Sequence, residues 1–400
     1  MEPKYKRTLY ASYLGYITQA IVNNLAPLLF VIFQQTFTLS VSRIAFLVTF
    51  NFSVQILTDL LSAGVIDRVG YKPCIVAAHI FSAAGLLGLG ILPGIMSHPY
   101  VGLLISIAVY AVGGGLIEVL VSPIVEALPT DGKSARMSLL HSFYCWGHAL
   151  VVILSTVFFG VAGTDAWRWL PILWTVIPAC NAFLFAGAPV LTYGNEAERS
   201  GGSKLSQMKI FWLFVVLMIC SGASEQAMSQ WSSYFAETGL CVSKSMGDLL
   251  GPCMFAILMG ASRWFYGIKG EKLPLEKFII FSSMMCVASY LLTVFSPIPL
   301  VSLIGCGLCG LSVGIMWPGV FSLSVKHCPQ ASTAMFATLA LAGDVGCAGG
   351  PTVVGFASQL FEGQVKVGLL AGIVFPLILI VGVFLLKGSI YRKQCISKVK

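Results

Sequence analysis

Hydrophobic stretches of membrane-spanning length follow one another along the whole chain and are separated by short polar segments. A helix needs about 20 predominantly apolar residues to cross a bilayer. The pattern therefore predicts an all-α membrane protein with twelve transmembrane helices. The predicted spans are residues 8–36, 42–66, 74–96, 99–128, 135–162, 167–192, 207–237, 243–268, 275–295, 298–327, 331–360 and 364–387.

Composition agrees with this pattern. The chain of 400 residues is 57% hydrophobic and 10% charged, with a mean hydropathy of +0.88, which is too apolar for a single soluble core. The apolar run after the basic N-terminus continues past Leu29 with no cleavage site, so we expect the first helix to stay in the membrane. Most of the 12 cysteines lie in apolar runs, and Cys306 and Cys309 lack a second ligand pair. We therefore expect neither a disulfide framework nor a metal site or other cofactor.

The net charge of +8 follows the predicted topology. When each Lys and Arg is assigned to the nearer face, 20 of the 24 lie on the N-terminal side, and the other side keeps only Arg43, Arg168, Lys244 and Lys366. The positive-inside rule then places both termini in the cytoplasm, with the protein in the inner membrane. We expect the basic tail, residues 387–400, to contact anionic lipids, and we expect no nucleic-acid partner.

A polar linker divides the predicted helices into two sets of six. We predict an N-terminal bundle at 1–192, a cytoplasmic linker at 193–207 and a C-terminal bundle with its basic tail at 208–400. Weak internal similarity indicates duplication, because Gly115 and Gly310 each precede a proline by eight residues in the fourth and tenth helices. Such parallel repeats are related by a pseudo-twofold axis along the membrane normal. We expect the protein to be a monomer.

Glu118 is an ionisable residue deep inside an apolar span, directly after the glycine run 113–115. An ionised carboxylate at that depth costs on the order of 3 kcal/mol, so such a residue usually faces a wet cavity. Burial favours the neutral carboxyl and water favours the charged one. Glu118 is therefore predicted to bind a proton or the substrate. The alternative is a neutral Glu118 that only bridges two helices.

Short motifs in several helices resemble one transporter family. The loop from Ile66 to Lys72 is similar to the basic loop after the second helix in the major facilitator superfamily. Further motifs are most similar to the fucose-permease-like sugar/proton symporters of that superfamily. This resemblance implies a secondary transporter that works by alternating access, takes a sugar or sugar derivative as substrate and couples its movement to protons. The motifs are Gly114–Glu118, Leu140-His141 with Gly147, Met316-Trp317-Pro318, and Gly343-Asp344 with Gly350-Pro351.

Polar side chains at helical spacing mark the candidate substrate site. The first and seventh helices each carry a polar stripe. Such stripes either line a wet path or bond to a neighbouring helix, because unpaired polar groups are costly in lipid. His148 and Asp344 take equivalent places in the two repeats, and Asp344 joins Glu118 as a proton-coupling candidate. The substrate-binding candidates are Gln19, Asn23, Asn24, His141, His148, Glu225, Gln226, Gln230, Trp231, Trp317 and Asp344.

The cytoplasmic ends of the second and fifth helices carry charged residues that we predict to close an inner gate. These are Asp59, Asp67, Arg68 and Arg136.

Two other functions stay open. The first is a drug/proton antiporter or other efflux carrier, although its usual helix-five glycine-proline signature is missing and only residues 346–351 in helix eleven look like it. The second is a polytopic membrane enzyme, which the chain does not favour because it has no HExxH motif, no nucleophile motif and no soluble catalytic domain. The identity of the solute and the direction of transport are also open.

Overall fold

The computed structural model describes residues 3–129, 133–191, 209–269, 274–327 and 333–399. Within these ranges the secondary structure is helical and contains no strand. Twelve helices or helix pairs are long and apolar enough to cross a membrane, six before residue 192 and six after residue 208. The predicted all-α membrane fold is confirmed.

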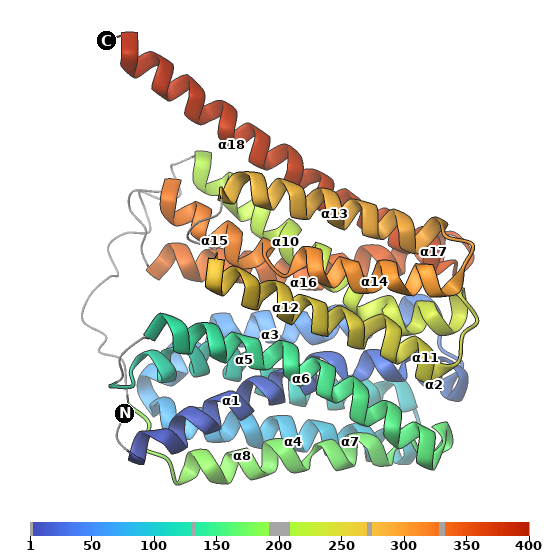
Figure 1. The fold of residues 1–400 in the computed structure, drawn as a ribbon. Coiled ribbons are helices and arrows are strands. Elements are labelled where there is room, and N and C mark those ends of the chain that lie inside the picture. The colour runs from blue at the N-terminus through green and yellow to red at the C-terminus, as the bar shows by residue number, and fades with distance from the viewer. Residues whose placement is uncertain (1–2, 130–132, 192–208, 270–273, 328–332, 400) are drawn as a thin grey trace.

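The first six spans form the lower part of the bundle in Figure 1 and the last six form the upper part. The first part comprises α1 (Pro3–Asn24), η1 (Ala26–Leu29), α2 (Phe30–Phe37), α3 (Val41–Val69), α4 (Tyr71–Ile95), α5 (Pro99–Glu126), α6 (Lys133–Ala162), η2 (Thr164–Ala166), α7 (Trp169–Trp174) and α8 (Val176–Ala186). The second part comprises α10 (Lys209–Tyr234), η3 (Phe235–Gly239), α11 (Lys244–Asp248), η4 (Leu249–Cys253), α12 (Met254–Lys269), α13 (Leu275–Phe295), α14 (Pro299–Val313), α15 (Met316–His327), α16 (Thr333–Leu360), α17 (Val365–Gly372) and α18 (Val374–Val399).

Several spans are broken into two segments. Pro27 lies in the short 3-10 helix between α1 and α2, and Pro252 lies in a π-helical turn between α11 and α12. Proline removes a backbone donor and clashes with the preceding turn, so it interrupts the α-helix there. Otherwise the predicted ends agree with the structure within a few residues, with two exceptions. The sixth helix ends at Ala186 rather than near residue 192, and the last helix continues past residue 387 to Val399.

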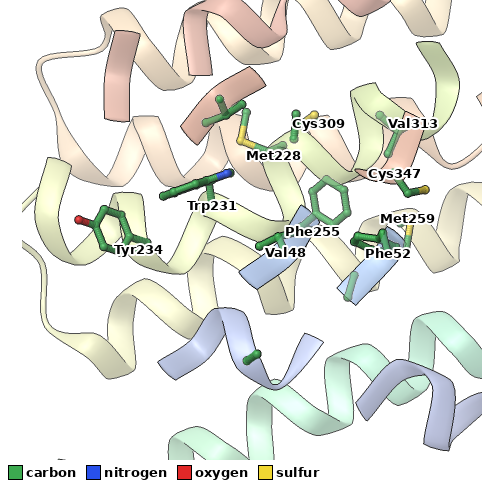
Figure 2. Close-up of a cluster of buried hydrophobic side chains, with 14 of the residues drawn as sticks. Val48, Phe52, Met228, Trp231, Tyr234, Phe255, Met259, Cys309, Val313 and Cys347 are labelled. Carbon is green, nitrogen blue, oxygen red and sulfur yellow. The ribbon is translucent and has the colours of Figure 1, made fainter. Parts of the chain in front are cut away.

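Two pairs of helices join the first six spans to the last six. α3 packs against α16, and α6 packs against α12. A buried apolar cluster continues across this contact, as Figure 2 shows: Val48 and Phe52 of α3 belong to the same cluster as Trp231 of α10 and Phe255 of α12. The two halves are therefore held by packed apolar side chains as well as by polar contacts.

The ends of the bundle differ, and we name them by the chain termini. At the terminal end α1 begins and α5 and α8 finish. α2, α11 and α17 lie at the opposite, distal end (Figure 1). Trp167 is only 3% exposed, and its ring packs edge-on against Phe33 with centroids 5.3 Å apart. An aromatic ring at the distal end has therefore become part of the core.

Glycines let α16 approach α10 closely within the second half. A Cβ built on Gly350 would lie 2.5 Å from the carbonyl oxygen of Ala223, whereas one built on the neighbouring Gly349 would meet nothing within 4 Å. Helices in membranes commonly pack through such small residues.

This pair of glycines supplies a matched stability test. Gly350→Ala should lower the melting temperature of the purified protein, since overpacking typically costs about 1–3 kcal/mol. Gly349→Ala should leave it unchanged or raise it, because alanine gains roughly 1 kcal/mol of helix propensity over glycine. Equal melting temperatures for the two variants would contradict the close packing of α10 and α16.

Candidate functional site

Buried amides connect Glu118 to the first and third helical elements. The Nε2 group of Gln19 on α1 donates to Glu118 Oε2 on α5 at 3.1 Å and to Gln55 Oε1 on α3 at 3.0 Å. Gln55 Nε2 in turn donates to Asn23 Oδ1 at 2.8 Å, and Asn51 Nδ2 donates to the same oxygen at 3.3 Å. The structure thus brings Gln19, Asn23 and Glu118 together, as the polar stripe predicts.

The chain of hydrogen bonds continues into the second half. Gln230 Nε2 on α10 donates to the backbone oxygen of Asn23 at 3.1 Å and to Gln226 Oε1 at 3.1 Å. Gln226 Nε2 donates to Glu225 Oε1 at 3.3 Å, and Arg263 of α12 forms an ion pair with Glu225 at 3.1 Å. Polar groups from both halves therefore form one connected set in the middle of the bundle.

Glu118 is exposed although it lies in the middle of α5. Its hydrogen-bond partner Gln19 is only 4% exposed, so Glu118 points into the bundle and not toward lipid. The exposure indicates a solvent-accessible space between the helices, which we call the central cavity. It is bordered by Glu118, Asp59, His141, Arg263 and Asp344, each of them at least partly exposed.

His141 and Tyr16 lie on the wall of this cavity. The two rings meet edge-on with centroids 5.1 Å apart. The Tyr16 hydroxyl also shares a hydrogen bond of 3.0 Å with Ser122 Oγ of α5. His141 is exposed and so remains available to a solute. Asn24, by contrast, uses its amide on the Ala20 carbonyl and the Tyr144 hydroxyl.

A lysine closes the distal end of the central cavity. Lys244 Nζ forms ion pairs of 3.1 Å with Glu237 and with Asp248 in the second half. The same nitrogen donates to the backbone oxygen of Leu28 in the first half at 2.6 Å. Ser233 also hydrogen-bonds to Asp248. This network ties α11 and η3 to the break between α1 and α2.

Further contacts close the same end. Thr49 Oγ1 and Thr352 Oγ1 are 2.5 Å apart across the contact of α3 with α16. The Tyr234 hydroxyl donates to Gln34 Oε1 at 2.7 Å, and the Ser42 amide donates to Gln359 at 3.3 Å. Each contact joins the first half to the second. The solvent that reaches Glu118 therefore enters from the terminal end.

Some predicted site residues have no surface on the central cavity in this conformation. Trp231 is fully buried, and its Nε1 donates to the Pro351 carbonyl at 3.0 Å. His148 is 2% exposed. Trp231 and His148 can therefore meet a solute only if the halves rearrange. Trp317 is only half-buried and lies beside Phe321, with ring centroids 6.4 Å apart.

The predicted inner gate lies at the open end. Asp59 borders the central cavity, whereas Arg68 is exposed, and neither forms an ion pair in the described part of the chain. The side chains of Asp67 and Arg136 lie outside the described residues. The gate role of all four residues stays a prediction.

The sequence interpretation missed three members of this site. Asn51 and Gln55 continue in steps of four to Asp59 on α3, which is a polar stripe at helical spacing that could have been recognised. Arg263 lies in the predicted span 243–268 but was only counted with the basic residues of the N-terminal side. The structure also places it within a membrane span, where it pairs with Glu225.

Comparison with known families identifies the fold. The sequence matches the model of the Major Facilitator Superfamily over residues 12–351. The chain belongs to the major facilitator superfamily. Among curated protein sequences, none matches it. As a member of this superfamily the protein is a membrane transporter and not an enzyme.

Solved structures of superfamily transporters share the fold. An inward-facing, unoccupied bacterial homologue of the human lysosomal transporter Spinster superimposes with a TM-score of 0.76 at 13% identity, covering 96% of this chain and 97% of that one. The xylose transporter XylE from E. coli, partially occluded and inward open, gives 0.73 at 15% identity over 94% and 97%. The transporter FucP in its outward conformation gives 0.65 at 17% identity over 94% and 98%.

The closed distal end can be tested by cross-linking. In a variant with the exposed Cys180 and Cys241 replaced by serine, Thr49→Cys with Thr352→Cys should form a disulfide under mild oxidation, because the two side chains touch. The cross-linked protein should lose transport and regain it on reduction, since alternating access requires this end to open. The single variants should keep transport under the same oxidant. Transport by the fully cross-linked protein would show that the distal end need not open.

Proposed function

We propose that this superfamily member is a secondary active transporter for a small polar solute, a sugar or sugar derivative, and that it couples solute movement to protons. The proposal rests on one observation above all. The carboxyl group of Glu118 lies in the middle of α5 and reaches solvent in the centre of the bundle. An ionisable group there can be charged when wet and neutral when enclosed.

The conformation supports alternating access. The distal end is closed by side-chain contacts, while Glu118 is exposed toward the terminal end. The positive-inside pattern of the sequence supports placing the termini in the cytoplasm, within the inner membrane. On that orientation the conformation is inward-facing. The higher TM-scores to two inward-facing structures than to an outward one favour the same assignment.

The solute site that we propose lies between the two halves. Gln19 and His141 supply groups from the first half, and Glu225, Gln226 and Arg263 supply groups from the second. Carboxylates and amide oxygens accept hydrogen bonds, while amide and guanidinium nitrogens donate them. A polyhydroxylated solute can use both kinds of partner. The fold of sugar transporters such as XylE is consistent with this solute class.

The role of Glu118 is tested by replacing it with glutamine, whose side chain is the corresponding amide. Glu118→Gln keeps an oxygen that can accept from Gln19 and has nearly the same volume, but it cannot titrate. In vesicles it should retain solute binding and energy-independent exchange, and lose accumulation driven by a pH gradient. Glu126→Gln makes the same chemical change two turns further along α5 and should accumulate solute as the parent does. The proposal fails if Glu118→Gln still concentrates solute at the parental level.

The contribution of the second half to solute binding is tested by removing one side chain. Gln226→Ala removes the link between Gln230 and Glu225 and should weaken solute binding measured by calorimetry. The expected loss is about 1–3 kcal/mol, since partners are left unpaired. Gln35→Ala, at an exposed glutamine of α2, is the matched control and should bind normally. Parental affinity in Gln226→Ala would place the solute elsewhere.

A further inference from the structure

The central cavity contains more acidic than basic side chains. Glu118, Asp59, Asp344 and Glu225 border or approach it, and the basic groups beside them are Arg263 and the imidazole of His141. Arg263 is paired with Glu225 at 3.1 Å. In the ranges that the structure describes, no basic side chain forms an ion pair with the other three carboxyl groups. Three acids are therefore left without a cationic partner.

The three unpaired acids act on one another. Asp344 lies within electrostatic range of both Glu118 and Asp59, and Asp59 lies within range of Glu118. They come from α5, α3 and α16, so Asp344 belongs to the second half and the other two to the first. Protonation of Glu118, as proposed above, still leaves Asp59 and Asp344 without a cationic partner in the described part of the chain. Like charges in a site of reduced dielectric repel strongly.

Buried oxygen atoms beside these acids also lack hydrogen-bond donors. Gln19 Nε2 donates to two acceptors, Gln55 Oε1 and Glu118 Oε2, and this fixes the orientation of its amide group. Its Oε1 is then left buried with no partner, as is Oδ1 of Asp59. The residue Gln19 is 4% exposed. A buried acceptor without a donor is costly, so both atoms call for a ligand that carries N–H or O–H groups.

Two glycines of α5 lie directly against these oxygen atoms. A Cβ built on Gly115 would lie 2.9 Å from Asp59 Oδ1, and one built on Gly114 would lie 3.1 Å from Gln19 Oε1. The two positions are adjacent on α5, so the unpartnered oxygens of α1 and α3 converge on one short stretch of that helix. Glu118 follows one turn later on the same helix.

We propose that the solute of this transporter carries a protonated amine, which Asp59 and Asp344 bind from the two halves with the free oxygen of Gln19 beside them. The inference rests on the proposed function, because it assumes that the central cavity binds the solute. An ammonium group offers positive charge and three N–H donors, which is what the unpaired acids and acceptors lack. A solute with an acidic group would instead meet three carboxylates and be repelled.

Matched sugars test this inference on the purified full-length protein. Calorimetry and thermal shift in potassium chloride should compare glucosamine, at a pH where its amine is protonated, with glucose and with N-acetylglucosamine. The three share the ring and differ in the charge at one carbon. Glucosamine should bind about ten- to a hundredfold more tightly, as expected for hydrogen bonds between charged groups. A fourth measurement replaces potassium with sodium in the absence of sugar.

Variants of the two acids test whether Asp59 and Asp344 bind the amine. Asp59→Asn and Asp344→Asn should each abolish the preference for glucosamine over glucose and N-acetylglucosamine. Asp165→Asn, at an exposed acid near the distal end, should keep the preference. If one of the two variants does not fold, the other still decides, because both acids are required.

The outcomes separate this inference from the proposed function. Equal affinity for the three sugars overturns the amine assignment and leaves the proposed function in place. A glucosamine preference that survives both variants overturns the assignment to Asp59 and Asp344. A response to sodium with none to any sugar overturns the inference in favour of a metal cation. Absence of any response contradicts both the inference and the proposed sugar class.

Discussion

One hydrogen-bond chain between the halves organises the centre of this transporter. It runs from Glu118 through Gln19, Gln55 and Asn23, and Gln230 joins it from the second half. Lipid offers no partners to polar groups, so these side chains must either satisfy one another or face water. The amides satisfy one another, and the carboxyl group at the end of the chain faces water. The position of the central cavity follows from that division.

The closure of the distal end uses contacts that can break. Lys244 donates a hydrogen bond to the Leu28 carbonyl, next to Pro27, where the first span is interrupted. The neighbouring span begins with the π-helical turn around Pro252. Broken helices offer backbone groups to partners in the other half, and such elements can rearrange without unfolding a whole span. Side-chain bonds to them can be exchanged as one end opens and the other closes.

Most of the fold could be predicted from the sequence, and the site only in part. Span positions follow from hydrophobic length, which lipid enforces directly. The polar stripes on α1 and α10 mark residues that hydrogen-bond to one another in the centre, which is one of the two alternatives that such stripes leave open. The exposure of individual side chains could not be predicted, because Trp231 and Glu118 both lie in the middle of a span. Trp231 is buried against Pro351, whereas Glu118 is exposed to solvent. Arg263 was overlooked as a site residue because a basic residue near a span end fits the membrane surface or a cavity equally well.

The directions of the hydrogen bonds link the charge of Glu118 to the contact between the halves. As a carboxylate, Glu118 accepts from Gln19, whose nitrogen also donates to Gln55; this orients the Gln55 nitrogen toward Asn23. Asn23 in turn accepts from Gln230 of the second half through its backbone. A protonated Glu118 offers one donor and one fewer acceptor site, and the free oxygen of Gln19 is the nearest unpartnered acceptor. When that new donor bonds to Gln19 rather than to water, Gln19 must reorient, and its bond to Gln55 is disturbed. A proton at Glu118 therefore changes the hydrogen-bonding needs of residues that reach the interface, without any charge having to move across it.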